Sequence, residues 1–297
     1  MMEHIPILVL VISFVCLLAI GTPVAWSIAI SSLLTMLVSI PAIPAFTTVS
    51  QRMATGLDSF ALLAIPFFVL SGELMNKGGI AHRLIAFAKT LVGSLPGGLA
   101  LINVIAAMLM GAIAGSAMAS ASAMGSILGP EMEKEGYSKE FGAAVNITSA
   151  TTGLIIPPSN VLIVYSLASG GASIAALFLA GYIPGIMTGL FLMIVAAFWA
   201  KKKKYKVGKR SSIKEVTKTF IDALPSLFML VVVIGGIVTG IFTATEASAI
   251  AVLYSLILGF IYKEITLPKL PQILLDSSAT TAIVMLLIGS SMCMSWA

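Results

Sequence analysis

Charged residues are scarce in this sequence. Asp, Glu, Lys and Arg make up 10% of the 297 residues and hydrophobic residues 59%, whereas a soluble domain is about 25% charged. The mean hydropathy is +1.08, which excludes a soluble globular domain. Apolar runs of about 17–25 residues recur along the chain, long enough to cross roughly 30 Å of hydrocarbon as helices. The sequence therefore predicts an all-α polytopic membrane protein.

Histidine and cysteine are also scarce. The two histidines, His4 and His82, lie near predicted membrane surfaces, whereas a serine hydrolase needs its histidine within hydrogen-bonding distance of a buried serine. Cys16 and Cys293 lie in apolar runs, as buried thiols do, and give no information on compartment. The sequence has no zinc-binding spacing, phosphate-binding loop or dinucleotide fingerprint. We therefore expect neither an enzyme nor an organic cofactor.

The net charge of +5 comes largely from one segment, "KKKKYKVGKR" at 201–210. Binding of nucleic acid is one explanation, but beside a membrane helix such a cluster typically marks the cytoplasmic side. We therefore expect no nucleic-acid partner. The first apolar run follows residues 1–4, "MMEH", which provide neither a basic n-region nor a clear cleavage site, so we expect no cleavable signal peptide.

Seven apolar segments are predicted to span the membrane as whole helices. They cover approximately residues 5–20, 23–40, 57–76, 174–200, 222–241, 244–262 and 277–296. With a periplasmic N-terminus and a re-entrant hairpin at 97–133 whose ends are both cytoplasmic, all but one of the 17 Lys and Arg residues are cytoplasmic, the exception being Arg52. A single crossing at 97–133 separates the basic segments onto opposite sides, which the positive-inside rule disfavours.

The stretch "ATTGLIIPPSNVLIVYS" (150–166) interrupts a further predicted membrane helix at 140–168. Pro157 and Pro158 lack backbone donors, so carbonyl groups are freed near the middle of the membrane. Lipid cannot bind these groups, so the break must be buried or line a cavity. In transporters, unwound carbonyls coordinate cations and helix N-termini face anionic substrates. The alternative is a proline kink whose hydroxyls bond back to their own helix.

A second run, "GAIAGSAMASASAMGS" (111–126), is rich in small residues. Gly111 and Gly115 are four residues apart, a spacing that lets helices approach closely, so helix packing alone is one explanation. The other is a hairpin tip that turns at Gly115. Neither run contains a charged residue, and neutral oxygens suit the hard cation Na⁺. The predicted Na⁺ ligands are Gly115, Ser116, Ser120, Ser122, Thr151, Thr152, Gly153 and Pro157, and the predicted substrate contacts are Pro158, Ser159 and Asn160.

The sequence contains an internal repeat. "GTPVAWSIAISSLLTMLVSI" and "LLAIPFFVLSGELM" resemble "GIFTATEASAIAVLYSLILGF" and "AIVMLLIGSSMCM", about 220 residues later. In the predicted topology the two copies enter from opposite sides, as in many secondary transporters. The predicted parts are first-repeat scaffold helices (1–76), an amphipathic interfacial arm (77–96), first-repeat transport elements (97–170, with the hairpin at 97–133 and the broken helix at 140–168), a connecting span and basic cytoplasmic loop (171–220), and the start of an incomplete second repeat (221–297).

Several motifs, in order, resemble the large membrane subunit of TRAP transporters (tripartite ATP-independent periplasmic transporters, DctM-type). They include "LLAIPFFVLSGELMNKGGIAHRL", "PEMEKEGYSKEFGAAVNITSATTGLIIPPSN" and "GIFTATEASAIAVLY". The resemblance implies an elevator fold, with a scaffold and a mobile transport domain, in the bacterial inner membrane. It implies Na⁺-driven import of organic acids such as dicarboxylates, sialic acid or other carboxylate sugars. The implied partners are a small four-helix membrane subunit (DctQ-type) and a periplasmic substrate-binding protein, besides membrane lipid.

We therefore expect the large subunit of a Na⁺-coupled, binding-protein-dependent importer of organic acids. Na⁺ is expected as the coupling ion. Two alternatives stay open: a stand-alone divalent-anion:Na⁺ symporter, and a non-transporting membrane scaffold or accessory subunit. The second repeat reaches residue 297 without a second hairpin or second broken helix, so we expect the chain by itself not to transport, because such transporters bind substrate between their two halves.

Overall fold

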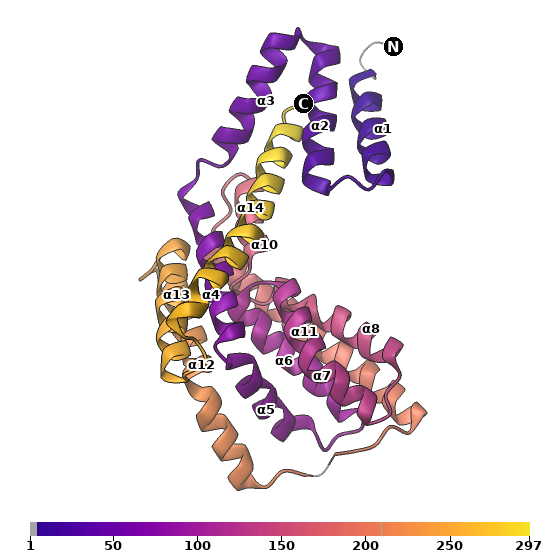
Figure 1. The fold of residues 1–297 in the computed structure, drawn as a ribbon, viewed down its shortest axis with the longest axis vertical. Coiled ribbons are helices and arrows are strands. Elements are labelled where there is room, and N and C mark those ends of the chain that lie inside the picture. Colours follow the sequence, from indigo (N-terminus) through magenta and orange to yellow (C-terminus); the bar gives the residue numbers. More distant parts are fainter. Residues whose placement is uncertain (1–4, 209) are drawn as a thin grey trace. The chain divides into compact units, whose positions relative to one another are not determined.

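The computed structural model describes residues 5–208 and 210–297, and within these residues it is helical, without a strand (Figure 1). The chain divides into two compact units. The first unit comprises residues 1–62 and 278–297, and the second unit comprises residues 63–277. The helices α14 (Leu270–Met294) and η2 (Phe60–Leu63), a short 3₁₀ helix, cross the boundaries between them.

The first unit contains α1 (Ile5–Ala19), α2 (Val24–Ser39), α3 (Ala42–Gly56) and the C-terminal part of α14. α1 packs along α2. Met36, Ala45 and Cys293 form a buried core in this unit. α1 and α2 have 15 and 16 residues, so each is shorter than the roughly 20 residues of a typical spanning helix.

Helix α3 lies between two of the predicted spans and was not among them. Pro41 and Pro44 stand at its start, where a missing backbone donor is tolerated. The hydroxyls of Thr47, Ser50 and Thr55 donate to carbonyls four residues earlier. α3 buries only Ala45, and its sequence, "AIPAFTTVSQRMATG", lacks the long apolar run that predicts the other helices.

In the second unit, α4 (Ala64–Lys77) packs along α13 (Ala244–Ile261), and α13 also contacts α12 (Ile213–Val238). The hydroxyl of Tyr254 in α13 donates to the carbonyl of Pro225 in α12 at 2.8 Å. α12 and α13 each begin with a capping box, in which a Ser or Thr and the Glu three residues later satisfy each other's backbone donors.

Helix α5 (Ile80–Val92) is the central part of the predicted amphipathic arm. It packs against α6 and α12, and the buried side chains lie on one face: Ile80, Ala81, Leu84, Ile85 and Ala88. The apolar face of α5 is therefore covered by other helices of the unit.

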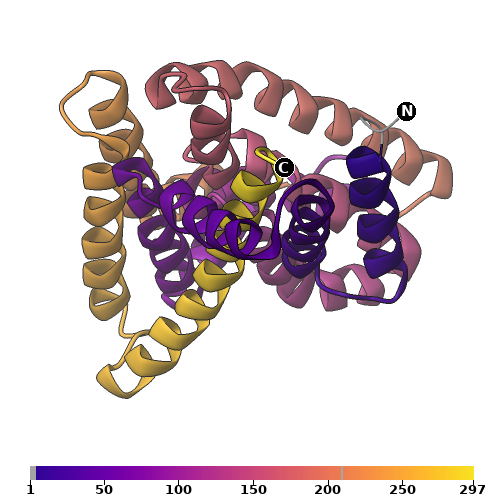
Figure 2. The ribbon, with the colours of Figure 1, turned by 90° about the horizontal axis from the view of Figure 1, so that it is seen from above.

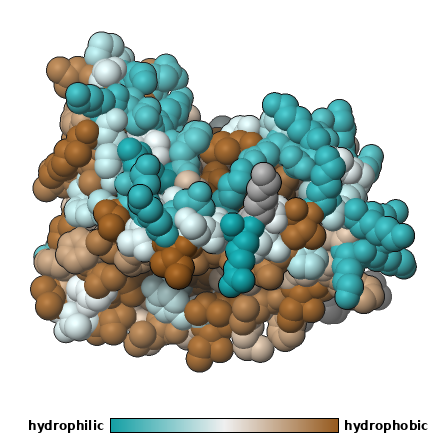
Figure 3. All heavy atoms as spheres, turned by 90° about the horizontal axis from the view of Figure 1, so that it is seen from below, coloured by the Kyte–Doolittle hydropathy of each residue, from teal (hydrophilic) through white to brown (hydrophobic). Residues whose placement is uncertain are grey.

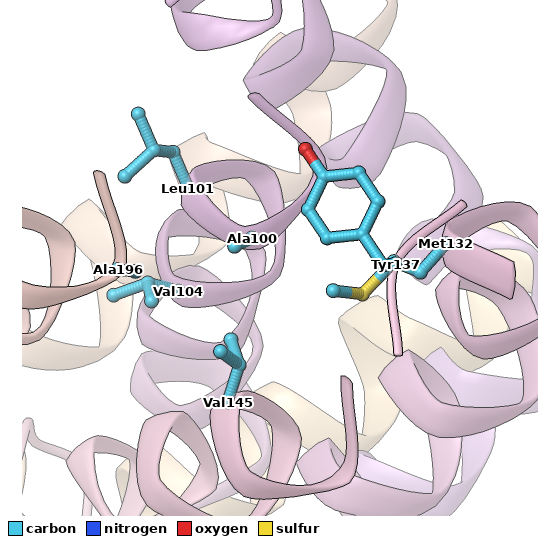
Figure 4. Packing of buried hydrophobic residues seen from close by; sticks show 7 residues of the cluster. All are labelled: Ala100, Leu101, Val104, Met132, Tyr137, Val145 and Ala196. Atoms are coloured by element: carbon cyan, nitrogen blue, oxygen red, sulfur yellow. The ribbon is translucent and has the colours of Figure 1, made fainter. Parts of the chain in front are cut away.

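The remaining helices form one packed group. α6 (Gly98–Ala114) and α7 (Ala117–Lys134) form a hairpin, and α8 (Lys139–Ala150), α9 (Thr152–Ile155) and α10 (Asn160–Ala168) form a broken helix bent by 51°. α11 (Ile174–Lys203) is 30 residues long and is the long helix at the top of Figure 2. Figure 4 shows part of the core that joins α6, the α7–α8 connection and α11.

Five helices of the described residues are long and apolar enough to cross a membrane, or six if the bent pair counts as one span. The five cover Phe60–Lys77, Ile174–Lys203, Ile213–Val238, Ala244–Ile261 and Leu267–Met294. The chain is therefore a multi-pass helical membrane protein.

A row of glycines in α11 forms the groove that receives the helix break. A Cβ at Gly181 would lie 2.5 Å from the carbonyl oxygen of Ile155, and a Cβ at Gly185 would lie 2.5 Å from the side chain of Ile156. Both distances are too short for real Cβ contacts, so the close packing of α11 on the break requires glycine.

We predict that Gly181→Ala lowers the free energy of unfolding by about 1–3 kcal/mol, because the added methyl group must displace backbone. Gly235→Ala in α12 is the matched control, since a Cβ there meets nothing within 4 Å; it should be neutral or stabilising by up to about 1 kcal/mol. Thermal unfolding in detergent measures both. Equal stability of the two variants would contradict the packing of α11 on the break.

Candidate functional site

The tip of the α6–α7 hairpin touches the break in the α8–α10 helix. Gly115 closes the hairpin with φ +60°, a conformation that favours glycine. A Cβ at Gly115 would lie 2.7 Å from the carbonyl oxygen of Pro158. Ser116 then begins α7, and its hydroxyl accepts a hydrogen bond from the backbone of Ala119 at 3.3 Å. The tip is therefore positioned directly against the break.

One turn before the tip, α6 and the broken helix meet backbone to backbone. A Cβ at Gly111 would lie 2.0 Å from Cα of Gly153, and a Cβ at Gly153 would lie 2.9 Å from Cα of Gly111. This contact is possible only between two glycines, because any side chain at either position separates the helices. The Gly111–Gly115 spacing thus does serve close packing, and the packing brings the break to the hairpin.

The break itself begins after α9. Ile156 has an extended backbone and Pro157–Pro158 is a cis peptide. The two prolines withhold the donors that the carbonyls of Gly153 and Leu154 would receive in a continuous helix. Ser159 supplies a replacement: its hydroxyl donates to the carbonyl of Leu154 and accepts from the backbone of Leu162 at 3.4 Å. One side chain therefore satisfies the break and caps α10.

Two side-chain oxygens at this junction are buried without a hydrogen-bond partner among the described residues, Ser120 Oγ and Asn160 Oδ1. Ser120 is fully buried. A Cβ built on Gly153 would lie 3.2 Å from Ser120 Oγ and 3.7 Å from the carbonyl oxygen of Ser116, so both oxygens face Gly153. An unpartnered buried oxygen is costly unless a ligand binds it.

We call this place, where the hairpin tip meets the break, the junction. It consists of Gly111, Gly115, Ser116, Ser120, Gly153, Pro157, Pro158, Ser159 and Asn160. Its side chains are uncharged, and the described residues contain no group of three or more His, Cys, Asp or Glu that could hold a metal ion. Its available ligands are therefore hydroxyl, amide and carbonyl oxygens, which match a hard monovalent cation better than a transition metal.

The structure brings most of the predicted site residues to the junction, but not all. Thr152 is buried beside it, and its hydroxyl donates to the carbonyl of Ser149 at 2.6 Å. Ser122 and Thr151 are exposed, and the hydroxyl of Thr151 donates to the carbonyl of Thr148 at 2.7 Å. Ser122 and Thr151 are therefore not placed to bind an ion at the junction.

Two asparagines that we did not predict hold the hairpin and the broken helix together. Asn103 in α6 accepts a hydrogen bond from the hydroxyl of Ser149 at 2.7 Å, with both residues buried. Asn146 in α8 donates to the carbonyl of Ala121 in α7 at 2.9 Å. The sequence carries a signal for Asn103, a single amide within the apolar run "LINVIAAML". The four-residue glycine spacing in α11 is a comparable signal.

A helical hairpin and a broken helix that meet at neutral oxygens in a membrane protein are features of secondary transporters. Residues 11–297 match the family described as "Tripartite ATP-independent periplasmic transporter, DctM component". The chain belongs to this family, the large permease subunits of TRAP transporters. The family consists of transporters rather than enzymes.

Three individual relatives illustrate the similarity, two of which are named as TRAP transporter large permease proteins. YgiK of Salmonella typhimurium is 57% identical over 98% of this chain and 67% of its own length. The C4-dicarboxylate TRAP transporter large permease protein DctM of Rhodobacter capsulatus is 36% identical over 95% of this chain and 67% of its own length. The sialic acid TRAP transporter large permease protein SiaM of Vibrio cholerae is 39% identical over 83% of this chain and 58% of its own length. The chain therefore spans about two thirds of the length of these relatives.

We predict that Ser159→Ala lowers the free energy of unfolding by about 1–3 kcal/mol, because it removes the cap of α10 and leaves a buried carbonyl unsatisfied. Ser173→Ala is the control, since Ser173 caps α11 at an exposed position and its loss should lie near the low end of about 0.5–2 kcal/mol. Thermal unfolding in detergent should rank the two variants in this order. Equal losses would show that Ser159 acts only as an ordinary cap.

Proposed function

We propose that this chain is the large transmembrane subunit of a Na⁺-coupled, binding-protein-dependent secondary importer of organic acids in the bacterial inner membrane. The family assignment supports import with a separate binding protein. The relatives named for C4-dicarboxylates and for sialic acid support a carboxylate substrate. The small four-helix subunit, the periplasmic substrate-binding protein and membrane lipid are the partners that this function requires.

The observation that carries Na⁺ coupling is the buried hydroxyl of Ser120 at the contact between the hairpin tip and Gly153, which has no hydrogen-bond partner among the described residues. In this proposal Ser120 Oγ, the carbonyl of Ser116 and the carbonyl of Gly153 bind Na⁺, with the hydroxyl of Thr152 nearby. Pro157 contributes by withholding a donor from the Gly153 carbonyl, which leaves that oxygen available to a cation.

The substrate carboxylate is proposed to bind beside this ion, at the start of α10. Ser159 caps α10 and Asn160 is its first residue, so the first backbone N–H groups of the helix point toward an anion placed there. The side-chain oxygen of Asn160 is buried and has no hydrogen-bond partner within residues 5–208 and 210–297. Its amide NH₂ group provides a donor for a carboxylate. Pro158 keeps this end of the break in its extended form.

Movement of these elements as one transport domain, in an elevator mechanism with an inverted repeat, is part of the proposal. Gly21 and Gly240 support the repeat, because both adopt positive φ just before the corresponding helices α2 and α13. The proposed topology places the N-terminus in the periplasm and both ends of the hairpin in the cytoplasm. It rests on the distribution of Lys and Arg.

Two other functions are less well supported. A stand-alone divalent-anion:Na⁺ symporter needs no binding protein, whereas the family matched by this chain is tripartite. A membrane scaffold has no need for a buried oxygen without a partner, which lowers stability unless a ligand binds it. Na⁺-dependent stabilisation separates the scaffold from both transporters.

We predict that Na⁺ raises the melting temperature of the purified chain, and that Ser120→Ala or Thr152→Ala weakens this effect. The Na⁺ concentration for half-maximal stabilisation should rise about tenfold in Ser120→Ala, which corresponds to about 1.4 kcal/mol of binding free energy. Ser122→Ala is the matched control, because it removes an exposed hydroxyl from the same helix. Choline chloride controls for ionic strength. Unchanged Na⁺ dependence in Ser120→Ala and Thr152→Ala would place the ion elsewhere.

We predict that cysteines at both ends of the hairpin react with impermeant reagents only from the cytoplasmic side. Leu95→Cys and Glu133→Cys are suitable because both positions are exposed, in a background in which Cys16 and Cys293 are replaced by serine and alanine. Gly98 is unsuitable, since a Cβ there would lie 2.4 Å from the carbonyl of Gly93. Labelling of one position from the periplasm and of the other from the cytoplasm would establish a complete crossing instead.

A further inference from the structure

The basic loop, residues 201–210, carries charge that the described part of the protein does not neutralise. The described cations of the loop are exposed: Lys201, Lys202, Lys203, Lys204, Lys206 and Arg210. Ion pairs elsewhere involve Lys77, Lys89 and Lys139, and none in the described residues involves the loop. A topology signal explains why this charge is on the cytoplasmic side, but it does not require the loop to have a defined structure.

The end of α11, where the loop begins, has the composition of a membrane interface. Phe198 and Trp199, at the end of the long apolar helix α11, are 71% and 43% exposed. The ammonium of Lys203 lies 5.7 Å from the centre of the Trp199 ring. Exposed aromatic residues next to lysines are typical of the membrane interface, the level at which lysines reach lipid phosphates.

The loop is held in place at two points. The ring of Tyr205 stacks on Tyr137 at 4.2 Å between centroids and contacts Phe141 at 5.8 Å. Tyr137 is buried in the core shown in Figure 4, and burial raises the pKa of its hydroxyl, so the stacked ring stays uncharged at physiological pH. Farther along, a Cβ at Gly208 would lie 2.5 Å from the carbonyl of Gly93. Residues 206 and 207 are thus presented in a fixed position between the two contacts.

Beneath the loop lies a cavity of about 750 Å³, bounded by α5 and by the cytoplasmic ends of the hairpin helices. Lys206 and Arg210 line it and are not ion-paired among the described residues. Glu131 lines it too but is paired with Lys89, and Glu215 accepts the backbone N–H of Ser212 at 2.8 Å. Glu135 is the one further carboxylate of the lining. The lining thus holds three cations and three carboxylates, and the excess of positive charge beside the cavity comes from Lys201, Lys202, Lys203 and Lys204 at the end of α11.

We propose that this cavity binds the phosphate headgroup of an acidic phospholipid, through Lys206 and Arg210, while the lysines at the end of α11 contact neighbouring headgroups. A lipid is favoured over a soluble anion because Phe198 and Trp199 adjoin the loop and Val207, between the two cations, is 55% exposed. Figure 3 shows hydrophilic and hydrophobic side chains intermixed on the side of the molecule toward which the loop lies. The site does not depend on the transport activity proposed above.

Brominated lipids test the proposal on the full chain. Trp26→Phe and Trp296→Phe leave Trp199 as the single fluorescent reporter, next to the site. In vesicles of phosphatidylcholine, we expect brominated phosphatidylglycerol to quench Trp199 at lower mole fraction than brominated phosphatidylcholine does. The preference should weaken as the salt concentration rises, because ions screen the attraction.

Matched variants distinguish binding in the cavity from a general attraction between the basic residues and anionic lipid. Lys206→Gln with Arg210→Gln should lower the preference for phosphatidylglycerol about fivefold per cation removed, the factor that about 1 kcal/mol per basic residue gives. Lys214→Gln with Lys218→Gln removes the same charge from exposed positions of α12 and should leave most of the preference intact. Tyr205→Ala should lower the preference without changing the charge, whereas Tyr205→Phe, which keeps the stacked ring, should not.

Three outcomes would overturn the proposal. Equal quenching by the two brominated lipids would show that no headgroup preference exists. Equal loss in the two double-glutamine variants would reduce the effect to the net charge of the cytoplasmic face. Relief of quenching by excess inorganic phosphate at constant ionic strength would show that the cavity takes phosphate from solution rather than from a lipid.

Discussion

The structure depends on how the protein satisfies the backbone groups of a broken helix, in surroundings where lipid offers no hydrogen bonds. Each unsatisfied backbone group in hydrocarbon costs several kcal/mol, so the break must be enclosed by other parts of the chain. Glycines make the enclosure possible: Gly111 and Gly115 bring the hairpin against one side, and Gly181 and Gly185 bring α11 against the other. The hairpin, the long helix and the break are therefore parts of one packing arrangement.

The same enclosure creates the chemistry of the junction. Close backbone packing leaves little room for long side chains, so the groups that meet there are carbonyls, hydroxyls and one amide. Ser159 satisfies the carbonyl of Leu154 from within the chain, but Ser120 Oγ is buried without a hydrogen-bond partner in the part of the chain that the structure describes. The junction therefore offers only neutral oxygen ligands, the property on which the proposed Na⁺ site depends.

The basic loop has a composition that can orient the chain in a membrane, and it also has a defined conformation. A run of lysines after a membrane helix is sufficient to orient a chain, and orientation needs no particular conformation. Tyr205 and Gly208 nevertheless fix the loop against Tyr137 and Gly93. This fixation joins the end of α11 to the connection between the hairpin and the broken helix, so the loop is part of the same packed group as the junction.

The sequence alone predicts those parts of the protein that local chemistry determines. Apolar runs define most of the helices, the tandem proline ends a helix wherever it lies, and a glycine between two apolar arms favours a turn. Helix α3 was missed because it buries only Ala45 and has no apolar run. The tertiary structure alone decided which hydroxyls meet at the junction: Ser120 and Ser122 have the same chemistry, yet one is buried against Gly153 and the other is exposed. The difference arises from the face that α7 turns toward the broken helix, which is set by packing between segments distant in the sequence.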